Sequence, residues 1–481
     1  MSSLVKATFW SAVHRFGGLF IGFVSNIVLA RLLSPNDYGV VGLIMVFVAL
    51  ADVLVDGGLG NALIQKKEIS RDDVSTVFTS NLVISIFLFL VIFLSAPSIA
   101  AYVDVVNFAV YLRVESIMIL LRALFVVYPS MLTREMNFRK LAGISMCVNT
   151  LSAVVAISMA CAGCGIWSLI VRNLCLDLFS LISYYIFCRL DFRLYINKGS
   201  FQNLFGFGFF IAIANLLESL YSNFLSFILG KKFSVEELGY YNQASSLERV
   251  PVSSITTILN QVFFPFLSKE QDEPDKMRFY MERSIKAMSF CIYPLMVYLI
   301  CFAQPIIILF YSEKWLPSVP FFQILCILGF TGFLYELNRS VLKAVGESRM
   351  LFHSQVLICC LGIVLIFCSI PYGIKAVVLS VVVNSVLGLL IVIAITGKQI
   401  DFGLCKQCKA LALNFLLAAL TGWITYLLMA RLSWSNILII VVSAIIYSGI
   451  YLLLHYMIKS SSFLIVESVL INQVREKRKN Q

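Results

Sequence analysis

The chain has 481 residues, of which 60% are hydrophobic and only 13% are charged, and its mean hydropathy is +0.91. A soluble protein of this length needs a polar surface that so few charges cannot supply, so most of its surface must face lipid. The net charge of +11 does not imply nucleic acid, since the basic residues lie in short segments between apolar runs and form no clustered footprint.

Fourteen apolar runs are each long enough to cross a bilayer as a helix, for which about 20 residues are needed. The sequence therefore predicts an all-α, polytopic membrane protein. The first run is followed by Arg31 and not by a small-residue cleavage site, so we expect a membrane span there and no cleaved signal peptide. The predicted spans are 10–30, 39–59, 74–94, 108–128, 141–162, 166–188, 205–229, 247–267, 285–310, 321–342, 351–370, 376–396, 410–430 and 437–457.

The loops between these runs carry a strong charge bias. If the N-terminus is cytoplasmic, the cytoplasmic segments hold 24 Lys and Arg residues and the outer loops hold 6. Because positively charged loops are retained in the cytoplasm, we expect both termini on that side of the membrane. Segments 66–71 and 269–283 should then face the cytoplasm, and Asn36 and Glu313 should face outward.

An internal repeat relates two loops of the chain. Segments 29–39 and 229–239 align at an offset of 200 residues, with Leu, Ser and Gly coinciding and an acid aligned with an acid. Six spans separate the copies, so the repeats would run parallel, which predicts two six-helix bundles, 1–198 and 199–400, able to rock about a central cavity. Two additional spans would follow at 401–458. The alternative is that short loops share Ser and Gly by chance.

The C-terminal tail, 459–481, is basic and is expected in the cytoplasm. Residues 463–474 place apolar side chains on one helical face and are followed by four basic residues. This pattern is typical of an interfacial helix on an anionic inner leaflet, and the alternative is a frayed basic tail.

Two Cys-x-x-Cys pairs are the strongest metal-like motifs. Cys161 and Cys164 fall on the opposite side of the predicted topology from Cys405 and Cys408, which excludes one shared zinc site. We expect neither a metal nor a cofactor.

Ionisable side chains inside the predicted spans are the candidate site residues, because a charge at the bilayer centre needs a partner or a wet cavity. One interpretation is a hydrated, net-cationic cavity that binds phosphate groups, with Arg15, Arg122 and Arg339 converging at similar depth. The other is a set of ion pairs that only stabilise helix packing, since Glu115 and Arg122, and likewise Glu336 and Arg339, are spaced to share a helix face. The candidate substrate-binding residues are Arg15, Arg122, Arg339, Arg113, Arg172 and Arg249. The candidate ion-coupling residues are Glu218, Asp52, Asp56, Glu115 and Glu336.

Three segments near the N-terminus carry a family pattern. They are Phe9-Trp10-Ser11 with Arg15-Phe16-Gly17-Gly18, residues 28–39 (VLARLLSPNDYG) and residues 56–67 (DGGLGNALIQKK). In these segments the chain resembles bacterial polysaccharide flippases, in the O-antigen, colanic-acid and teichuronic-acid exporter branch of the multidrug/oligosaccharidyl-lipid/polysaccharide exporter superfamily.

The resemblance implies a fold and a function. It implies two six-helix bundles arranged as a V, two extra C-terminal helices, and a place in the bacterial inner membrane. The implied substrate is an undecaprenyl-pyrophosphate-linked oligosaccharide, flipped from the inner to the outer leaflet by alternating access. The implied partners are a coupling cation (proton or sodium), membrane lipids and the polysaccharide polymerase machinery. No phosphate-binding P-loop motif occurs in the chain, which agrees with transport driven by an ion gradient.

Two other functions remain open. A drug or cation exporter of the same superfamily would share the bundles, but its cavity should be acidic and aromatic. A membrane-embedded sugar polymerase or ligase would be an enzyme with a sizeable outer loop, whereas the outer loops predicted here are short. We therefore expect a transporter and no enzyme.

Overall fold

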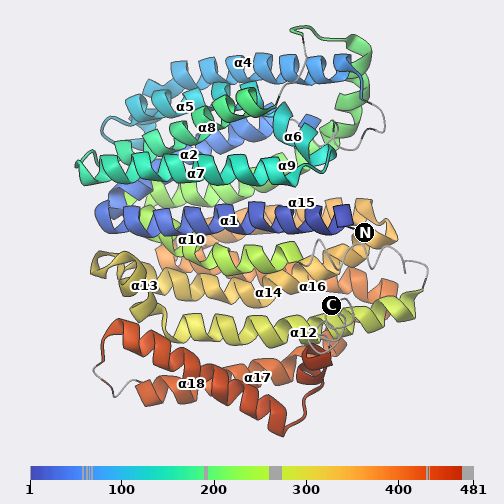
Figure 1. Ribbon diagram of the computed structural model, residues 1–481. Helices are drawn as coiled ribbons and strands as arrows, with labels where there is room; N and C mark the ends of the chain where they lie inside the picture. Colours follow the sequence, from blue (N-terminus) through green and yellow to red (C-terminus); the bar gives the residue numbers. More distant parts are fainter. Residues whose placement is uncertain are drawn as a thin grey trace. The chain divides into compact units, whose positions relative to one another are not determined.

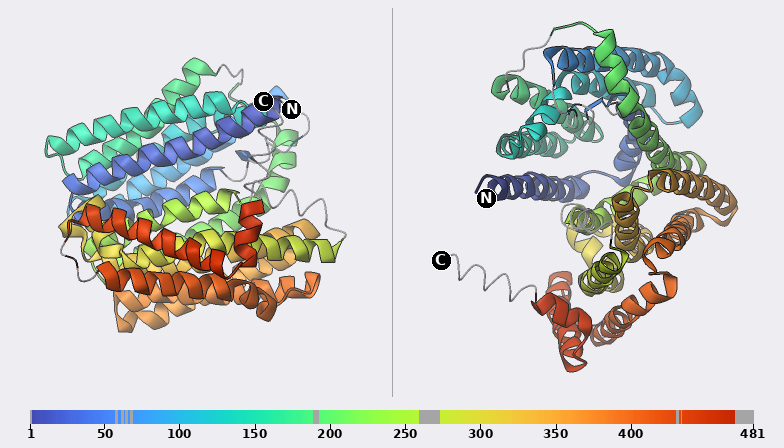
Figure 2. Two further views of the ribbon diagram at one scale, coloured as in Figure 1. Left: turned by 60° about the horizontal axis from the view of Figure 1, so that its bottom comes forward. Right: turned by 90° about the vertical axis from the view of Figure 1, so that its right-hand side faces the viewer.

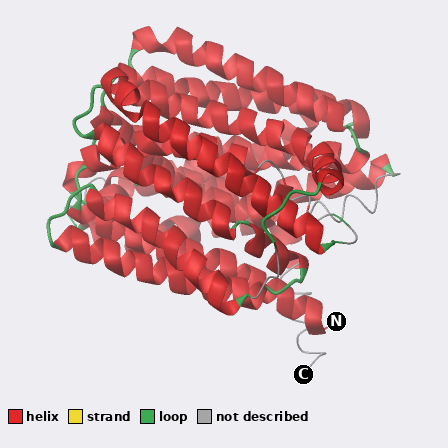
Figure 3. Cartoon of the chain, turned by 90° about the horizontal axis from the view of Figure 1, so that it is seen from above, coloured by secondary structure: helices red, strands yellow, loops and turns green. Residues whose placement is uncertain are grey.

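The computed structural model describes residues 2–56, 59–60, 63, 66, 69–188, 193–258, 273–429, 432 and 434–468, without the side chains of 2–9, 56, 203–215, 218, 253–258 and 348. Over these residues the chain is helical almost throughout and contains no strand (Figure 3). The all-α prediction is confirmed. Helices satisfy their own backbone hydrogen bonds, which is what a lipid environment without water demands.

The contacts divide the chain into two compact units, Met1–Asn242 and Gln243–Gln481. In the first unit α1 packs on α7, α7 on α8, α5 on α4 and α8, and α2 on α9 (Figure 1). The division falls within α10. The helices concerned are α1 (Ser2–Leu32), α2 (Pro35–Asp56), α4 (Arg71–Val103), α5 (Phe108–Phe125), α6 (Val127–Arg134), α7 (Phe138–Cys161), α8 (Trp167–Phe187), α9 (Lys198–Lys232) and α10 (Val235–Ile258).

In the second unit α12 packs on both α14 and α17, while α16 packs on α14 and α15. The last two long helices, α17 and α18, run side by side (Figure 2). A further helical segment, 461–468, follows α18. The helices of this unit are α12 (Pro274–Cys301), α13 (Ala303–Tyr311), α14 (Ser318–Val345), α15 (Ser348–Ser369), α16 (Ile374–Ile400), α17 (Leu404–Met429) and α18 (Asn436–Met457).

Eleven helices of the described residues are long and apolar enough to span a membrane, and each overlaps one of the fourteen predicted spans. The fourth predicted span is helical as α5 but carries three charged side chains, Arg113, Glu115 and Arg122. The seventh predicted span, 205–229, is helical throughout as part of α9, and the eighth is helical up to residue 258, where its described part ends. The chain is thus a multi-pass membrane protein.

The ninth predicted span, 285–310, is interrupted in the structure. Its helix α12 ends at Cys301, and α13 starts again at Ala303. Pro305 lies in the first turn of α13 and has no N–H to donate to the carbonyl of Cys301. A continuous helix would therefore lack one hydrogen bond at this point, and the break between α12 and α13 falls here.

The two segments of the predicted repeat have the same local structure. The side chain of Ser34 accepts a hydrogen bond from the backbone N–H of Asp37 at 3.2 Å, and the Ser234 hydroxyl accepts one from the N–H of Glu237 at 3.0 Å. A Ser side chain followed three residues later by an acid is the usual way to satisfy the first N–H groups of a helix. These caps start α2 and α10, which begin at equivalent positions of the two segments.

The starts of α2 and α10 also touch each other in a reciprocal way. A Cβ added at Gly39 would lie 1.8 Å from the carbonyl oxygen of Val235, and a Cβ added at Gly239 would lie 1.9 Å from that of Pro35. Both positions must therefore be glycine for the two helix starts to approach this closely. A twofold relation between residues 200 apart would produce this reciprocity.

The predicted domain boundaries remain a prediction. The first compact unit extends beyond the predicted boundary after residue 198, because α9 packs on α2 and α4. The predicted interfacial helix, 463–474, is helical over its described part, and residues 469–474 lie outside the described residues.

Candidate functional site

The guanidinium group of Arg122 on α5 joins three helices of the first unit. It forms an ion pair with Asp52 on α2 through Nη1, and its Nε donates to the Oδ2 atom of Asp177 on α8 at 2.9 Å. One third of the Arg122 side chain, 34%, is still exposed, against 10% of the Asp177 side chain. The arginine is thus held by two carboxylates while part of its surface stays accessible.

A third carboxylate lies two turns away from Arg122 on α5. Glu115 is completely buried, and its Oε1 atom accepts a hydrogen bond of 2.7 Å from the side-chain amide of Asn173 on α8. Its second oxygen, Oε2, is buried with no hydrogen-bond partner among the described residues. A buried carboxylate oxygen without a donor is costly, so this atom is a natural place for a proton or a cation.

The three carboxylates outnumber the arginine that they surround. With Asp52, Asp177 and Glu115 ionised, the cluster around Arg122 carries a formal charge of about −2. The predicted pairing of Arg122 with Glu115 within one helix is replaced by pairing with α2 and α8. We refer to Asp52, Glu115, Arg122, Asn173 and Asp177 as the Arg122 cluster.

The sequence reasoning missed Asp177 and Asn173. Asp177 is a carboxylate inside a predicted span, which is the same signal that selected Glu115 and Asp52, so it could have been found. Asn173 carries no charge, and no sequence signal distinguished it from other polar residues in spans.

Arg113 has a structural explanation. Pro97 lies inside α4 and has no N–H, so the carbonyl of Phe93 lacks its normal helical donor. The Nε atom of Arg113 donates to that carbonyl at 3.2 Å, and the guanidinium lies 4.9 Å from the centre of the Phe93 ring. This arginine therefore supplies the hydrogen-bond donor that the proline removes from α4.

The remaining candidate arginines of the first unit differ in exposure. Arg172 on α8 has a buried Nε atom with no hydrogen-bond partner among the described residues. Arg15 on α1 is exposed and forms no ion pair within the described part of the chain. Neither belongs to the Arg122 cluster by contact.

In the second unit, Arg339 and Glu336 form the predicted pair on α14, with Nη1 3.2 Å from Oε1. The Arg339 guanidinium also lies 5.4 Å from the centre of the Tyr335 ring. Arg249 on α10 is exposed. The predicted convergence of Arg15, Arg122 and Arg339 is not tested by these contacts and remains a prediction.

Two predicted ion-coupling residues lie outside the described side chains. Glu218 is on α9 and Asp56 is the last residue of α2. The four cysteines of the two Cys-x-x-Cys pairs are free and exposed.

Comparison with known proteins places the chain in a family. Residues 28–320 match the family described as "Polysaccharide biosynthesis protein". The chain is 26% identical over 423 residues to the teichuronic acid biosynthesis protein TuaB of Bacillus subtilis, covering 87% of each chain. It is 27% identical over 350 residues to the succinoglycan biosynthesis transport protein ExoT of Rhizobium meliloti, covering 71% of this chain and 69% of the relative.

A solved structure shares the fold. The lipid II flippase MurJ, in an inward closed conformation, superposes with a TM-score of 0.71 at 17% sequence identity, covering 93% of this chain and 98% of the other. Together with the family match, this confirms the resemblance found in residues 9–67. The chain belongs to the polysaccharide biosynthesis protein family of multi-pass membrane proteins.

Proposed function

We propose that this chain flips an undecaprenyl-pyrophosphate-linked oligosaccharide from the inner to the outer leaflet of the bacterial inner membrane, by alternating access driven by an ion gradient. The family match, the transport function of a named relative and the flippase fold support this proposal. The single observation that carries a mechanism is the Arg122 cluster, in which an accessible arginine is held by carboxylates from two other helices.

In the Arg122 cluster, the carboxylates and the substrate phosphate compete for the Arg122 guanidinium. This competition links binding of the phosphate to binding of cations by the carboxylates. While Asp52 and Asp177 are ionised they occupy two edges of the guanidinium, and they repel an approaching pyrophosphate. Protons or other cations that neutralise the carboxylates release the arginine for bidentate binding of phosphate oxygens. Loss of those cations restores the ion pairs and expels the phosphate. Substrate binding and cation binding therefore favour each other.

Because cations that travel outward with the substrate would move against an inward cation gradient, the driving force at this cluster is the membrane potential acting on the pyrophosphate. Moving one negative charge outward across an inside-negative membrane releases about 2.3 kcal/mol per 100 mV. Release of the pyrophosphate on the outer side is favoured by this free energy, provided that the charge of the pyrophosphate is no longer neutralised by the cluster.

Flipping in reconstituted vesicles tests the proposal. Arg122→Ala should lower the rate at which a polyprenyl-pyrophosphate oligosaccharide is flipped by about tenfold or more, since a charge-assisted contact contributes roughly 1.5–3 kcal/mol. Arg122→Lys should restore part of the rate, because it keeps the charge and loses the planar fork. Asp177→Asn should shift the pH dependence of flipping, since it removes one carboxylate that competes with the substrate. The matched control is Lys375→Ala, an exposed residue at the start of α16.

The outcomes separate transport from folding. Membrane levels and melting temperatures of all variants must match those of the unchanged protein for the rates to be compared. If Arg122→Ala inserts normally and flips at the full rate, the role of Arg122 in substrate binding is wrong, and the cluster only stabilises the packing of α2, α5 and α8.

A drug or cation exporter is the second candidate function, and the three carboxylates of the Arg122 cluster favour it. An acidic site would attract a lipophilic cation, and Asp177→Asn would then weaken its export. Export of a fluorescent lipophilic cation from the same vesicles distinguishes the two functions, because the flippase should leave that cation untouched.

A further inference from the structure

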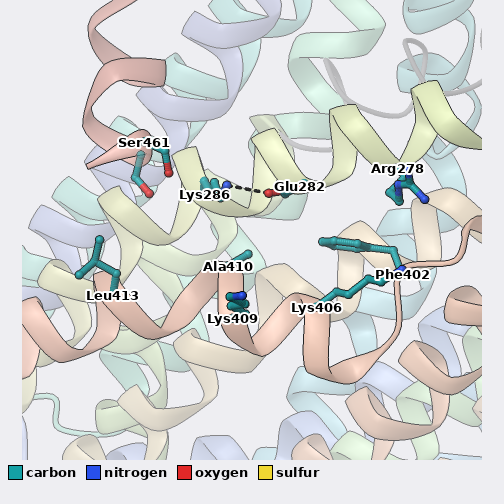
Figure 4. Close-up of a pocket in the computed structure, with 10 residues that line it drawn as sticks. Arg278, Glu282, Lys286, Phe402, Lys406, Lys409, Ala410, Leu413 and Ser461 are labelled. Atoms are coloured by element: carbon teal, nitrogen blue, oxygen red, sulfur yellow. Dashed lines mark hydrogen bonds and ion pairs between the residues drawn. The ribbon is translucent and has the colours of Figure 1, made fainter. Parts of the chain in front are cut away.

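A cavity of about 600 Å³ in the second unit is lined by four basic side chains and one acid. It lies between α12, the start of α17 and the helical segment 461–468, and Figure 4 shows side chains from these three elements around it. We refer to it as the basic cavity. None of its residues belongs to the candidate transport site.

The spacing of the lining residues explains why they share one cavity. On α12 they are Arg278, Glu282 and Lys286, four residues apart, and therefore lie on one face of the helix. On α17 they include Lys406 and Leu413, seven residues apart, again on one face. The two helices pack against each other, so both faces border the same space.

Most of the basic groups are held in place by acids, and one is not. Lys286 pairs with Glu282 at 2.6 Å, while Asp401 binds Lys406 at 2.7 Å and Arg278 at 3.5 Å. The hydrogen bond from Lys406 lowers the pKa of Asp401 below its usual value.

Lys409 is the fourth basic residue that lines the cavity. It is exposed and forms no ion pair within the described part of the chain. Its ammonium group is therefore available to a ligand of opposite charge.

The start of the helical segment 461–468 adds donors to the same cavity. The hydroxyl of Ser460 accepts from the backbone N–H of Phe463 at 3.2 Å and so caps this segment. The backbone N–H groups of the two lining residues, Ser461 and Ser462, have no acceptor among the described residues. Unpaired N–H groups at a helix start favour an anion.

The polarity of the cavity changes along the helices. The basic residues of α17 lie in its first two turns, and Leu413 lies about 10 Å further along the axis from Lys406, at 1.5 Å per residue. Leu413 is exposed. The predicted spans begin at residues 285 and 410, next to Lys286 and Lys409, so we expect the polar end of the cavity at the membrane boundary and the apolar end, at Leu413, within the lipid.

We propose that the basic cavity binds the phosphate head group of an anionic phospholipid, whose acyl chain follows α17 past Leu413. Lys409, Lys286 and the N–H groups of Ser461 and Ser462 would contact the phosphate. Basic pockets between membrane helices at the cytoplasmic surface have the chemistry that such head groups require. The predicted topology places this end of α12 and α17 on the cytoplasmic side. The proposal is independent of the flippase function.

Lipid binding to the purified full chain tests this site. In native mass spectrometry, phosphatidylglycerol should bind more tightly than phosphatidylcholine. Lys409→Gln should weaken phosphatidylglycerol binding about fivefold, and Lys286→Gln combined with Lys409→Gln should weaken it further, since each basic residue near a lipid surface contributes on the order of 1 kcal/mol. Lys398→Gln is the matched control, because Lys398 is exposed at the end of α16 and does not line the cavity. It should leave binding unchanged.

Three results would overturn the proposal. One is equal affinity for phosphatidylglycerol in the Lys409→Gln and Lys398→Gln variants, with both folded as judged by their melting temperatures. Another is displacement of the lipid by millimolar inorganic phosphate, which would indicate a site for free phosphate. The third is tighter binding of polyprenyl pyrophosphate than of phosphatidylglycerol, lost in Lys409→Gln, which would assign the cavity to the transported lipid.

Discussion

At the scale of single residues, charged side chains in this chain have different structural settings even where the sequence treats them alike. Arg122 and Arg113 both lie on α5, nine residues apart, and both were candidates for substrate binding. Arg122 is held between carboxylates of α2 and α8, whereas Arg113 donates to a backbone carbonyl that Pro97 leaves without a donor. Only Arg122 is positioned between groups that can themselves gain or lose charge.

The stabilisation of α4 by the Arg113 hydrogen bond can be measured in a double-mutant cycle of the unchanged protein and three variants. Arg113→Ala should lower the free energy of unfolding by about 1–3 kcal/mol, because it leaves the carbonyl of Phe93 without a donor. Pro97→Ala restores an N–H at the normal helical position, so Arg113→Ala should cost much less in that background. Unfolding in mixed detergent micelles measures all four proteins. An equal cost in both backgrounds would show that the arginine acts by some other contact.

At the scale of elements, the contact between α2 and α10 depends on the absence of side chains. Gly39 faces the carbonyl of Val235, and the equivalent Gly239 faces the carbonyl of Pro35. Backbone atoms cannot move aside as a flexible side chain can. The first turns of the two helices are therefore restricted to glycine at these positions, while their Ser-x-x-acid caps set where each helix begins.

Alanine substitutions at two glycines should have different effects on stability. Gly39→Ala places a Cβ 1.8 Å from a backbone oxygen, so it should force α2 and α10 apart and lower stability by about 1–3 kcal/mol. Gly22→Ala in α1 meets nothing within 4 Å and should be neutral or stabilise by up to about 1 kcal/mol, since alanine is the better helix former. The melting temperatures of the two variants in detergent provide the comparison. Similar values for the two variants would contradict the close contact.

At the scale of the whole molecule, the predicted topology assigns each loop to one side of the membrane. The eleven membrane-spanning helices of the described residues agree with the predicted spans, yet helix positions alone do not say which end is cytoplasmic. The charge bias of the loops supplies that direction.

Native cysteines can report this direction. Cys161 and Cys164 follow or end α7, and Cys405 and Cys408 lie at the start of α17; all four are exposed. In a variant that keeps only the first pair, a membrane-impermeant maleimide should label intact cells. In a variant that keeps only the second pair, labelling should require permeabilised cells. The reverse pattern would invert the topology, and labelling of both pairs in intact cells would contradict the fourteen-span arrangement.

The sequence by itself determined the helical class and the positions of most spans, and it showed the shared Ser and acid of segments 29–39 and 229–239 that the structure reveals as helix caps. These features depend on composition and on neighbours within a few residues: a bilayer requires apolar helices of a certain length, and a Ser three residues before an acid starts a helix locally. The candidate charges were also visible, because an ionisable residue is conspicuous within an apolar run.

The tertiary structure alone decided which of those charges meet. Asp52 and Asp177 lie 70 and 55 residues from Arg122 in the chain, and the basic cavity joins α12 to the start of α17 and segment 461–468. In a soluble protein an apolar stripe indicates how each helix is rotated toward the core. A helix in lipid is apolar on every side, so its rotation is set by close packing and by polar partners on neighbouring helices, and those partners are known only once the helices are assembled.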